Sequence, residues 1–233
     1  MKKIIVIGIV SFLLFSGLTY TLNNVVTGEP LTEEININFE FENIQIENVN
    51  IHQTEFNRVT IEDDSMSYTS SPGNPVLPVK GCNIVIPYGH EVDSISVSKK
   101  GLVSFSADLS VEPAQRVYPY NYEGDFVFEE PNMEVYGSDD VYPSSDYEVV
   151  STQVFRGYTI LVLRLYPVKY NPIIGQVDLY RDVEVSVKTS SVSDSGSVSD
   201  NYRGLEKDLD EVKKRVDNPS FVDSVSVSPH VSS

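Results

Sequence analysis

Residues 35–51 read ININFEFENIQIENVNI, a stretch in which apolar and polar side chains alternate almost strictly. A period of two is that of a β-strand with one buried and one solvated face, because successive side chains point to opposite sides of a sheet. The polar positions are mostly Asn and Glu, which suits an exposed edge or a sheet packed on one side only. The stretch therefore predicts β-structure, and the alternation continues more weakly from Glu55 to Tyr68.

The composition of the whole chain also favours β-structure. It is rich in Val, Ile and Thr and has 14 Tyr and 10 Phe but no Trp, and such residues suit half-buried pleated surfaces. The 233 residues, 40% of them hydrophobic, are enough for one domain with a real core plus appendages. We predict an all-β fold, an antiparallel β-sandwich that is jelly-roll-like.

The chain is strongly acidic, with 17 Lys and Arg against 34 Asp and Glu and a formal net charge of −17. Without Lys2 and Lys3 the charge becomes 15 − 34 = −19. Nucleic acid is therefore not expected as a partner, because binding phosphates requires clustered basic side chains. A basic protein surface would be attracted instead.

The N-terminus has the pattern of an export signal. Lys2 and Lys3 precede an apolar run from Ile4 to Leu18, which a polar stretch follows up to Asn24. The run has about 15 residues, which fits a signal peptide and falls short of the roughly 20 that span a bilayer. We predict a signal peptide over residues 1–24 and a secreted or extracellular protein. No A-x-A cleavage pattern occurs, so an uncleaved segment that anchors the protein at the cell surface stays an alternative, and it would be the only membrane contact.

Strand-like runs and turn signals fill residues 28–188, which we predict to be the β-sandwich. Residues 71–79 hold three prolines and one glycine, which favours a rigid, extended crossing. Two hairpins are expected. One turns at Lys99-Lys100-Gly101, and the other joins strands at 158–166 and 177–187.

The chain changes character after residue 188. Residues 189–202, almost all Ser, Val, Asp and Gly, predict a flexible linker. A connector helix is expected over 203–217, because Leu205, Leu209, Val212 and Val216 lie on one helical face. The rest, residues 218–233, is expected to be a disordered tail.

A long acidic loop is predicted from Ala114 to Tyr142. Between Arg116 and Arg156 there is no Lys or Arg, while nine acids and six tyrosines occur there. We expect one short strand at 126–128 within it, and loops of this length are usually functional or disordered. The Asp spacing of a calcium loop is absent, so solvated acids are favoured over a calcium site, and no metal or cofactor is expected.

Catalytic motifs are missing from the sequence. There is no phosphate-binding glycine loop, Gly-x-Ser-x-Gly elbow or His-Glu-x-x-His helix. Cys82 and His90 could be drawn as a nucleophile and its base, but Cys82 opens an apolar strand, where a buried thiol is the ordinary outcome. We predict that this chain is not itself an enzyme.

Three segments, in order, resemble the pro-region of gingipain-type cysteine peptidases. They are residues 72–89, with PGNPVLPV and IVIPYG; residues 113–143, from Pro113-Ala114 to Tyr142-Pro143; and residues 155–187, with FRGY, LYPVKYNP and VDLY. The third is the most specific, because its spacing of aromatic residues, prolines and Arg-Gly is hard to obtain from generic strand composition. Residues 216–220 also resemble the join to the peptidase domain.

The resemblance implies a zymogen pro-domain that assists the folding of a caspase-like cysteine peptidase domain and inhibits it. The active-site His and Cys of that family lie in the downstream domain and have no counterpart here. For arginine-specific members of the family, the resemblance further suggests that a basic side chain from a pro-region loop enters the specificity pocket of the peptidase. Arg116 is the candidate, and Tyr118, Tyr120 and Tyr122 complete the predicted inhibitory loop.

Two other functions stay open on the sequence. The same tyrosines could stack on sugars, which would make the chain an exported carbohydrate- or surface-binding module. A stand-alone secreted peptidase inhibitor is the other alternative. The downstream coding sequence separates these possibilities, because a pro-region needs a peptidase attached to it.

Overall fold

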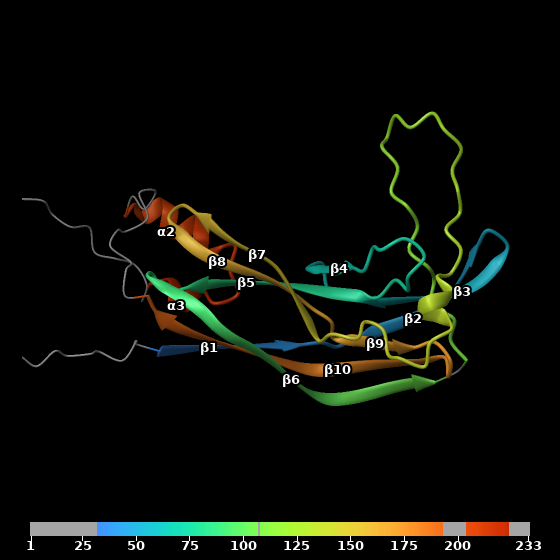
Figure 1. Cartoon of the computed structure of the whole chain (residues 1–233), viewed down its shortest axis with the longest axis horizontal. Coiled ribbons are helices and arrows are strands. Elements are labelled where there is room, and N and C mark those ends of the chain that lie inside the picture. The colour runs from blue at the N-terminus through green and yellow to red at the C-terminus, as the bar shows by residue number, and fades with distance from the viewer. Residues whose placement is uncertain (1–31, 107, 193–203, 224–233) are drawn as a thin grey trace, which may run out of the picture.

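The computed structural model describes residues 32–106, 108–192 and 204–223 (Figure 1). Most of these residues lie in strands, and every pairing between the named strands is antiparallel. Helices are few and short. The predicted all-β, antiparallel fold is confirmed.

The first sheet is built around β10 (Gln176–Ser191). On one side β6 (His90–Ser106) pairs with β10 along its whole length. On the other side β9 (Val168–Asn171) and then β1 (Thr32–Glu40) follow one another along β10. β1 is thus an edge strand, as its Asn-rich outward face predicts.

The second sheet has the strand order β4-β5-β8-β7. Its strands are β4 (Met66–Tyr68), β5 (Pro78–Ile86), β8 (Tyr158–Leu165) and β7 (Tyr147–Phe155). β7 and β8 form a tight hairpin whose turn residues, Arg156 and Gly157, both have positive φ, 52° and 87°. That combination is typical of a type I′ turn. A further hairpin, β2 (Ile44–Ile51) and β3 (Thr54–Ile61), extends from one end of the molecule (Figure 1).

The two sheets lie face to face and share one hydrophobic core (Figure 1). Alternate side chains of the first sheet point inward, while the Asn and Glu residues between them face solvent. The buried members include Ile35, Ile37, Val183, Val185 and Val187 of the first sheet and Cys82, Ile84, Ile86, Leu161, Leu163 and Leu165 of the second. This is the sandwich that the period-two pattern predicts.

The outer face of the second sheet is covered as well. There α2 (Glu206–Lys213) and α3 (Pro219–Val222) pack over Val85, Tyr158 and Ile160 in a second hydrophobic cluster. Strands buried on both faces read as continuous apolar runs. This explains the uninterrupted sequence Ile84-Val85-Ile86.

The hairpin expected at Lys99-Lys100-Gly101 is wrong, because β6 runs through these residues as one 17-residue strand. Gly101 has φ +66°. Its neighbours Leu102 and Lys100 pair with Tyr180 and Asp182 of β10, so Gly101 itself lies opposite Arg181. A Cβ at Gly101 would lie 3.0 Å from the Cβ of Arg181. The glycine therefore permits a close approach inside the sheet, not a turn.

The hairpin expected between 158–166 and 177–187 is also wrong. These segments are β8 and β10, central strands of different sheets. The proline-containing connection crosses from one sheet to the other and contributes β9, which pairs with the start of β10. Residues 126–128, expected as a short strand, form no strand. Among the residues that the structure describes between β6 and β7, the one helix or strand is α1 (Met133–Tyr136).

The C-terminal part is more closely integrated than the sequence indicates. β10 continues to Ser191, three residues into the predicted linker. The helix expected over 203–217 is present as α2, but it packs on the sandwich and is not a detached connector. Residues 218–223, expected in the disordered tail, contain α3 with a fully buried Val222.

The predicted signal peptide and most of the predicted linker lie outside the described residues, and their assignment stays a prediction. Within the described ranges no helix is long and apolar enough to cross a membrane.

Candidate functional site

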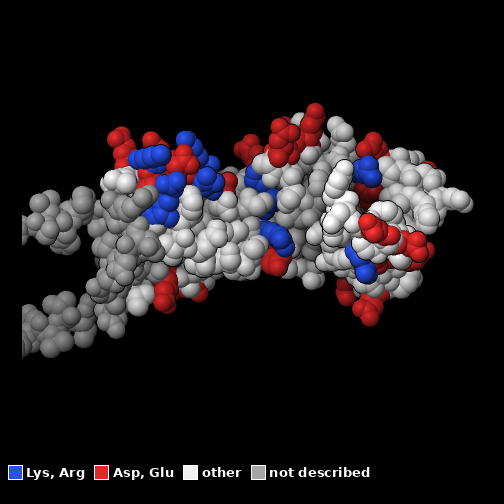
Figure 2. Space-filling view, turned by 90° about the horizontal axis from the view of Figure 1, so that it is seen from above, with Lys and Arg blue, Asp and Glu red and all other residues white. Residues whose placement is uncertain are grey.

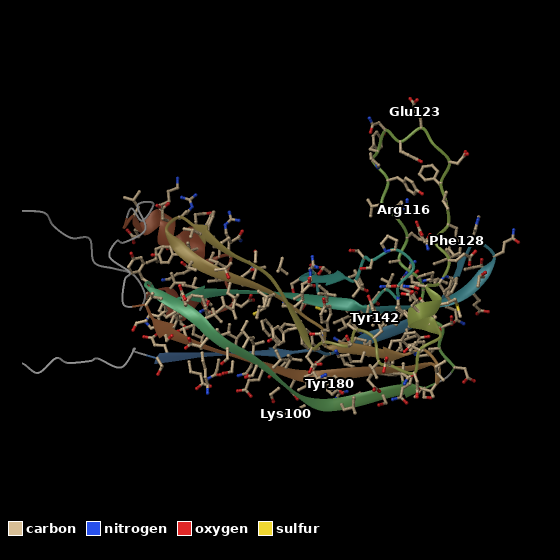
Figure 3. The ribbon with its side chains drawn as sticks, in the orientation of Figure 1. Lys100, Arg116, Glu123, Phe128, Tyr142 and Tyr180 are labelled. Atoms are coloured by element: carbon tan, nitrogen blue, oxygen red, sulfur yellow. The ribbon has the colours of Figure 1, made fainter. Side chains whose placement is uncertain are left out.

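Residues 115–131, here called the arm, leave the sandwich as a long loop between β6 and α1 (Figures 1 and 3). The arm rises on the side of the second sheet, with Glu123 at its outer end and Arg116 and Phe128 on its two legs (Figure 3). It corresponds to the first half of the predicted acidic loop. The second half, residues 132–142, instead folds back onto the sandwich through α1.

Both ends of the arm are tied to the same two residues of the proline-rich crossing. Gly73 N donates to Ala114 O and Ala114 N donates to Asn74 O, both at 2.8 Å. At the other end Asn132 N donates to Gly73 O at 2.8 Å, and its side-chain amide donates to Asn74 Oδ1 at 2.9 Å. The rigid crossing over 71–79 therefore clamps the base of the arm.

The segment that leads into the arm is held by side chains from α1, β9 and β3. Tyr136 donates its hydroxyl to Val111 O at 2.7 Å, and Tyr170 donates to Leu109 O at 2.8 Å. Burial raises the pKa of both phenols, so both stay protonated donors at neutral pH. Arg58 of β3 makes two hydrogen bonds to the Glu112 carboxylate, at 2.6 and 2.9 Å.

The two legs of the arm are cross-linked by hydrogen bonds. Gln115 and Glu129 exchange a pair of bonds, Glu129 N to Gln115 Oε1 at 3.0 Å and Gln115 Nε2 to Glu129 O at 3.2 Å. Arg116 Nε donates to Glu129 Oε1 at 2.8 Å. These contacts give the lower part of the arm a defined spacing although it contains no strand.

An aromatic cluster fills the upper part. The ring of Tyr118 lies 4.6 Å from that of Tyr122 and 5.1 Å from that of Phe126, between centroids. The Tyr118 hydroxyl accepts from Val127 N at 3.1 Å, across the arm. Lower down, Phe128 contacts the ring of His52 in the β2–β3 turn, at 5.1 Å.

The four predicted site residues thus lie on one arm but have different surroundings. Tyr118 and Tyr122 build the aromatic cluster, and Arg116 belongs to the cross-linked legs. Tyr120 projects fully into solvent, with an exposed fraction of 108%. Gln115, Phe126 and Glu129 were missed, and only the apolar Phe126 in an acidic stretch gave a signal in the sequence.

The surface of the arm is acidic and apolar at once. It carries Glu123, Asp125, Glu129 and Glu130 with Arg116 as its one cation. Val117, Phe126 and Val127 are between 63% and 87% exposed. Figure 2, which looks down on the side from which the arm rises, shows Lys and Arg gathered at the other end of the molecule. Large exposed apolar side chains on a rigid support mark interaction sites.

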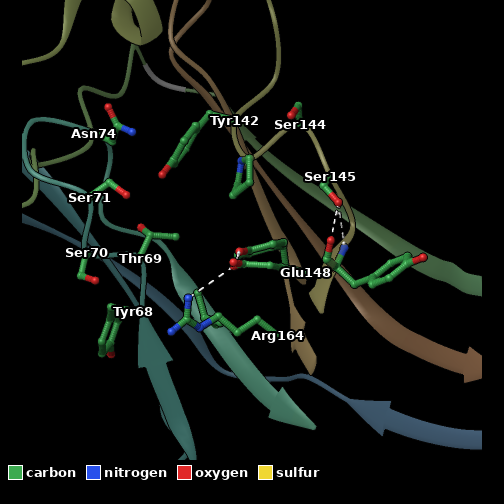
Figure 4. Close-up of a pocket in the computed structure, with 14 residues that line it drawn as sticks. Tyr68, Thr69, Ser70, Ser71, Asn74, Tyr142, Ser144, Ser145, Glu148 and Arg164 are labelled. Carbon is green, nitrogen blue, oxygen red and sulfur yellow. Dashed lines mark hydrogen bonds and ion pairs between the residues drawn. The ribbon is translucent and has the colours of Figure 1, made fainter. Parts of the chain in front are cut away.

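A groove of about 550 Å³ lies at the foot of the arm (Figure 4). Hydroxyl groups dominate its lining, which includes Tyr68, Thr69, Ser71, Tyr142, Ser144 and Tyr166. Glu148 accepts from Tyr166 at 2.9 Å and pairs with Arg164 at 3.3 Å. In the part of the chain that the structure covers, no three His, Cys, Asp or Glu side chains gather as a metal site would require.

Cys82 does not have the surroundings of a nucleophile. It is fully buried in the core, and burial, with a smaller effect of Asp217, raises the pKa of its thiol to about 12. His90 instead lies 3.1 Å from the Thr189 hydroxyl. A thiol that stays protonated at neutral pH is inert, in agreement with its structural interpretation.

The aromatic cluster should control the order of the arm, which limited proteolysis at Glu123 can measure. Tyr118→Ala removes two ring contacts and the hydrogen bond to Val127 N, so a glutamate-specific protease should cut the arm about 10-fold faster. The thermal midpoint of the sandwich should not change. Tyr120→Ala, outside the cluster, is the matched control, and equal acceleration by both variants would show that the cluster does not order the arm.

Comparisons with known proteins agree with this architecture. The family model Propeptide_C25 matches residues 30–215. A chain of the complex of Porphyromonas gingivalis RgpB pro- and mature domains is similar at a TM-score of 0.61 and 16% identity, over 82% of this chain and 92% of that one. A structure concerned with the zymogenic latency of gingipain K from Porphyromonas gingivalis is similar at a TM-score of 0.55 and 18% identity, over 72% and 96%. No curated protein matches the chain.

Proposed function

Because the chain belongs to the Propeptide_C25 family, the pro-domains of gingipain-type peptidases, we propose that it binds a caspase-like cysteine peptidase domain, assists its folding and holds it inactive. The arm is the inhibitory element, and the sandwich is its support. This chain supplies no catalytic group to the peptidase.

The observation that carries this proposal is the construction of the arm. Its base is clamped to Gly73 and Asn74, its legs are cross-linked, and its upper part is packed by three rings. An inhibitor that is ordered before binding loses little conformational entropy when it enters a cleft. The arm therefore suits the occupation of an active-site cleft better than a disordered loop of the same composition.

The negative charge of the arm favours a partner whose active-site cleft has a basic rim. The carboxylates around Glu123 and Asp125 would accelerate association with such a surface, and salt would weaken this effect. The exposed rings and Val117 would supply contacts that persist at high salt. We therefore expect the association rate to fall with ionic strength and the dissociation rate to change little.

The side chain that enters the partner most deeply is expected to be Tyr120. It is fully exposed near the outer end of the arm, whereas Arg116 is paired with Glu129 on the legs. Tyr120→Ala should raise the inhibition constant about 30-fold, as loss of an aromatic interface anchor does. Arg116→Ala should raise it only a few-fold, because an exposed ion pair contributes little. A larger loss with Arg116→Ala would indicate a partner whose specificity pocket takes a basic side chain.

Steady-state inhibition in trans tests the proposed function. The purified domain should inhibit the amidase activity of a cognate caspase-like peptidase domain with one-to-one stoichiometry, and it should increase the yield of active peptidase on refolding. A domain that leaves both activity and yield unchanged would favour the surface-binding alternative. Export and a location outside the cell are part of the proposal and rest on the predicted signal peptide.

A further inference from the structure

β5, a central strand of the second sheet, has an edge that is left uncovered by every strand in the described part of the chain. β4 pairs with β5 only from Pro78 to Lys80, although β5 continues to Ile86. On its other side β5 pairs with β8 along residues 80–86. The backbone groups of Asn83 and Val85 that point toward the uncovered edge therefore need partners from elsewhere.

Two adjacent residues near the C-terminus supply these partners. Asp217 accepts from Asn83 N at 2.7 Å and donates its own N–H to Asn83 O at 2.8 Å. The amide side chain of Asn218 imitates a backbone unit, with Oδ1 accepting from Val85 N at 2.9 Å and Nδ2 donating to Val85 O at 3.0 Å. Asn83 Nδ2 adds a bond to Arg215 O at 3.0 Å.

The same segment buries an apolar face on the sheet. Val212 and Val222 are fully buried and Val216 is nearly so, against Val85, Tyr158 and Ile160. An ion pair joins Arg156, in the β7–β8 turn, to the buried Asp208 of α2. Residues 205–223 thus contact the sandwich through an apolar face, a charge pair and a strand edge at once, which is how sheets bind peptides.

We propose that the uncovered edge of β5 and the outer face of β8 form a peptide-binding site, and that its ligand is the chain's own segment 205–223. This segment is held by its contacts and does not need the backbone that connects it to β10. Binding therefore survives a cut in that connection. Any chain that continues beyond residue 223 stays attached to the sandwich without a covalent bond.

The site is separate from the arm. It lies at the end of the molecule where α2 and α3 are, while the arm rises at the opposite end (Figure 1). The attachment and the inhibition can thus be lost independently. A precursor cut between β10 and α2 would keep its pro-domain bound while gaining two new chain ends.

A cleavable version of the full chain tests the site. A recognition sequence for a site-specific protease replaces residues 195–201, and a fluorophore is attached at the C-terminus. After complete cleavage, the two fragments should elute together in gel filtration at micromolar concentration and separate only in denaturant. Serial dilution should give a dissociation constant of about 1 μM or tighter. Fragments that separate as soon as the chain is cut would overturn the proposal.

Substitutions in the ligand segment test which contacts hold it. Asn218→Ala removes the two hydrogen bonds that the Asn218 side chain makes to the N–H and C=O groups of Val85. The dissociation constant of the cleaved segment should therefore rise about 30-fold or more. Lys214→Ala is the matched control, since Lys214 is exposed and pairs with Glu211 of the same segment. It should leave the dissociation constant within about 2-fold of the unsubstituted chain. Equal constants for both variants would contradict the role of the β5 edge.

Discussion

Replacing residues 117–127 with a short Gly-Ser link is expected to raise the inhibition constant for the cognate peptidase domain at least about 100-fold. The replacement removes the aromatic cluster, the exposed Tyr120 and the carboxylates of Glu123 and Asp125. It spares the clamp at Gly73 and Asn74 and the bond from Tyr136 to Val111, on which the fold of the base depends. The thermal midpoint should stay within about 2 °C of the unsubstituted domain.

The control for the replacement of residues 117–127 removes exposed apolar side chains outside the arm. Ile173 and Ile174, in the turn between β9 and β10, are 57% and 50% exposed. Their double replacement by Ser should leave the inhibition constant unchanged. Full inhibition by the domain without residues 117–127 would place the inhibitory surface outside the arm, and equal losses in both variants would indicate unspecific apolar contact.

The second large effect concerns a charge cluster that connects the two sheets. Asp146, just before β7, accepts from Lys99 of β6 at 2.5 Å and lies 3.0 Å from Lys169 of β9. The Lys169 side chain is only 5% exposed and also donates to Pro143 O at 2.8 Å. Asp146→Ala should lower the free energy of unfolding by about 2 kcal/mol, less than a fully buried pair because the carboxylate is partly exposed.

The loss of stability caused by Asp146→Ala should depend on pH in a direction that the pKa of Asp146 determines. Burial alone would raise the pKa of Asp146, but hydrogen bonds from Lys99 and Lys169 outweigh it and hold the pKa below its ordinary value. A carboxylate with a lowered pKa stabilises the fold fully above its unfolded pKa of about 3.9, and this stability is lost as pH falls through the folded pKa. The difference between Asp146→Ala and the unsubstituted domain should therefore shrink below about pH 4 in urea titrations. Asp139→Ala, which removes an exposed carboxylate, is the control and should leave the free energy of unfolding unchanged.

The strands were predictable where burial of one face makes apolar and polar residues alternate in the sequence. β1, β2 and β3 alternate, and their inward residues, such as Ile35 and Ile37, are those that the pattern selects. The failure at Lys99-Lys100-Gly101 has a physical cause, because a glycine with positive φ can serve a close approach between paired strands as well as a turn. Which strands pair was not predictable, since a proline-containing connection such as the one between β8 and β10 can close a hairpin or, as here, cross from one sheet to the other.

The position of the arm in the sequence was predictable, but the contacts that hold it were not. Acidity, length and tyrosine content located the arm. The clamp was not foreseen, because it joins Gly73 and Asn74 to residues about 40 and 60 positions later through backbone bonds that carry no sequence pattern. The docking of residues 205–223 was missed for a related reason. Its amphipathic face was visible, but β5 has an uncovered edge only because β4 begins at Met66, which pairs with Lys80, so that no residue of β4 lies opposite residues 81–86.

Photo-crosslinking tests most directly whether the arm occupies the active-site cleft of a cysteine peptidase domain. A photoreactive phenylalanine analogue is placed at Tyr120 in one variant and, as the control, at Leu102 of β6, which is 55% exposed on the first sheet. We predict that position 120 forms a crosslink to peptides lining the catalytic cleft of the peptidase domain and that position 102 forms none. Crosslinks from position 102, with none from position 120, would contradict the proposed function of the arm.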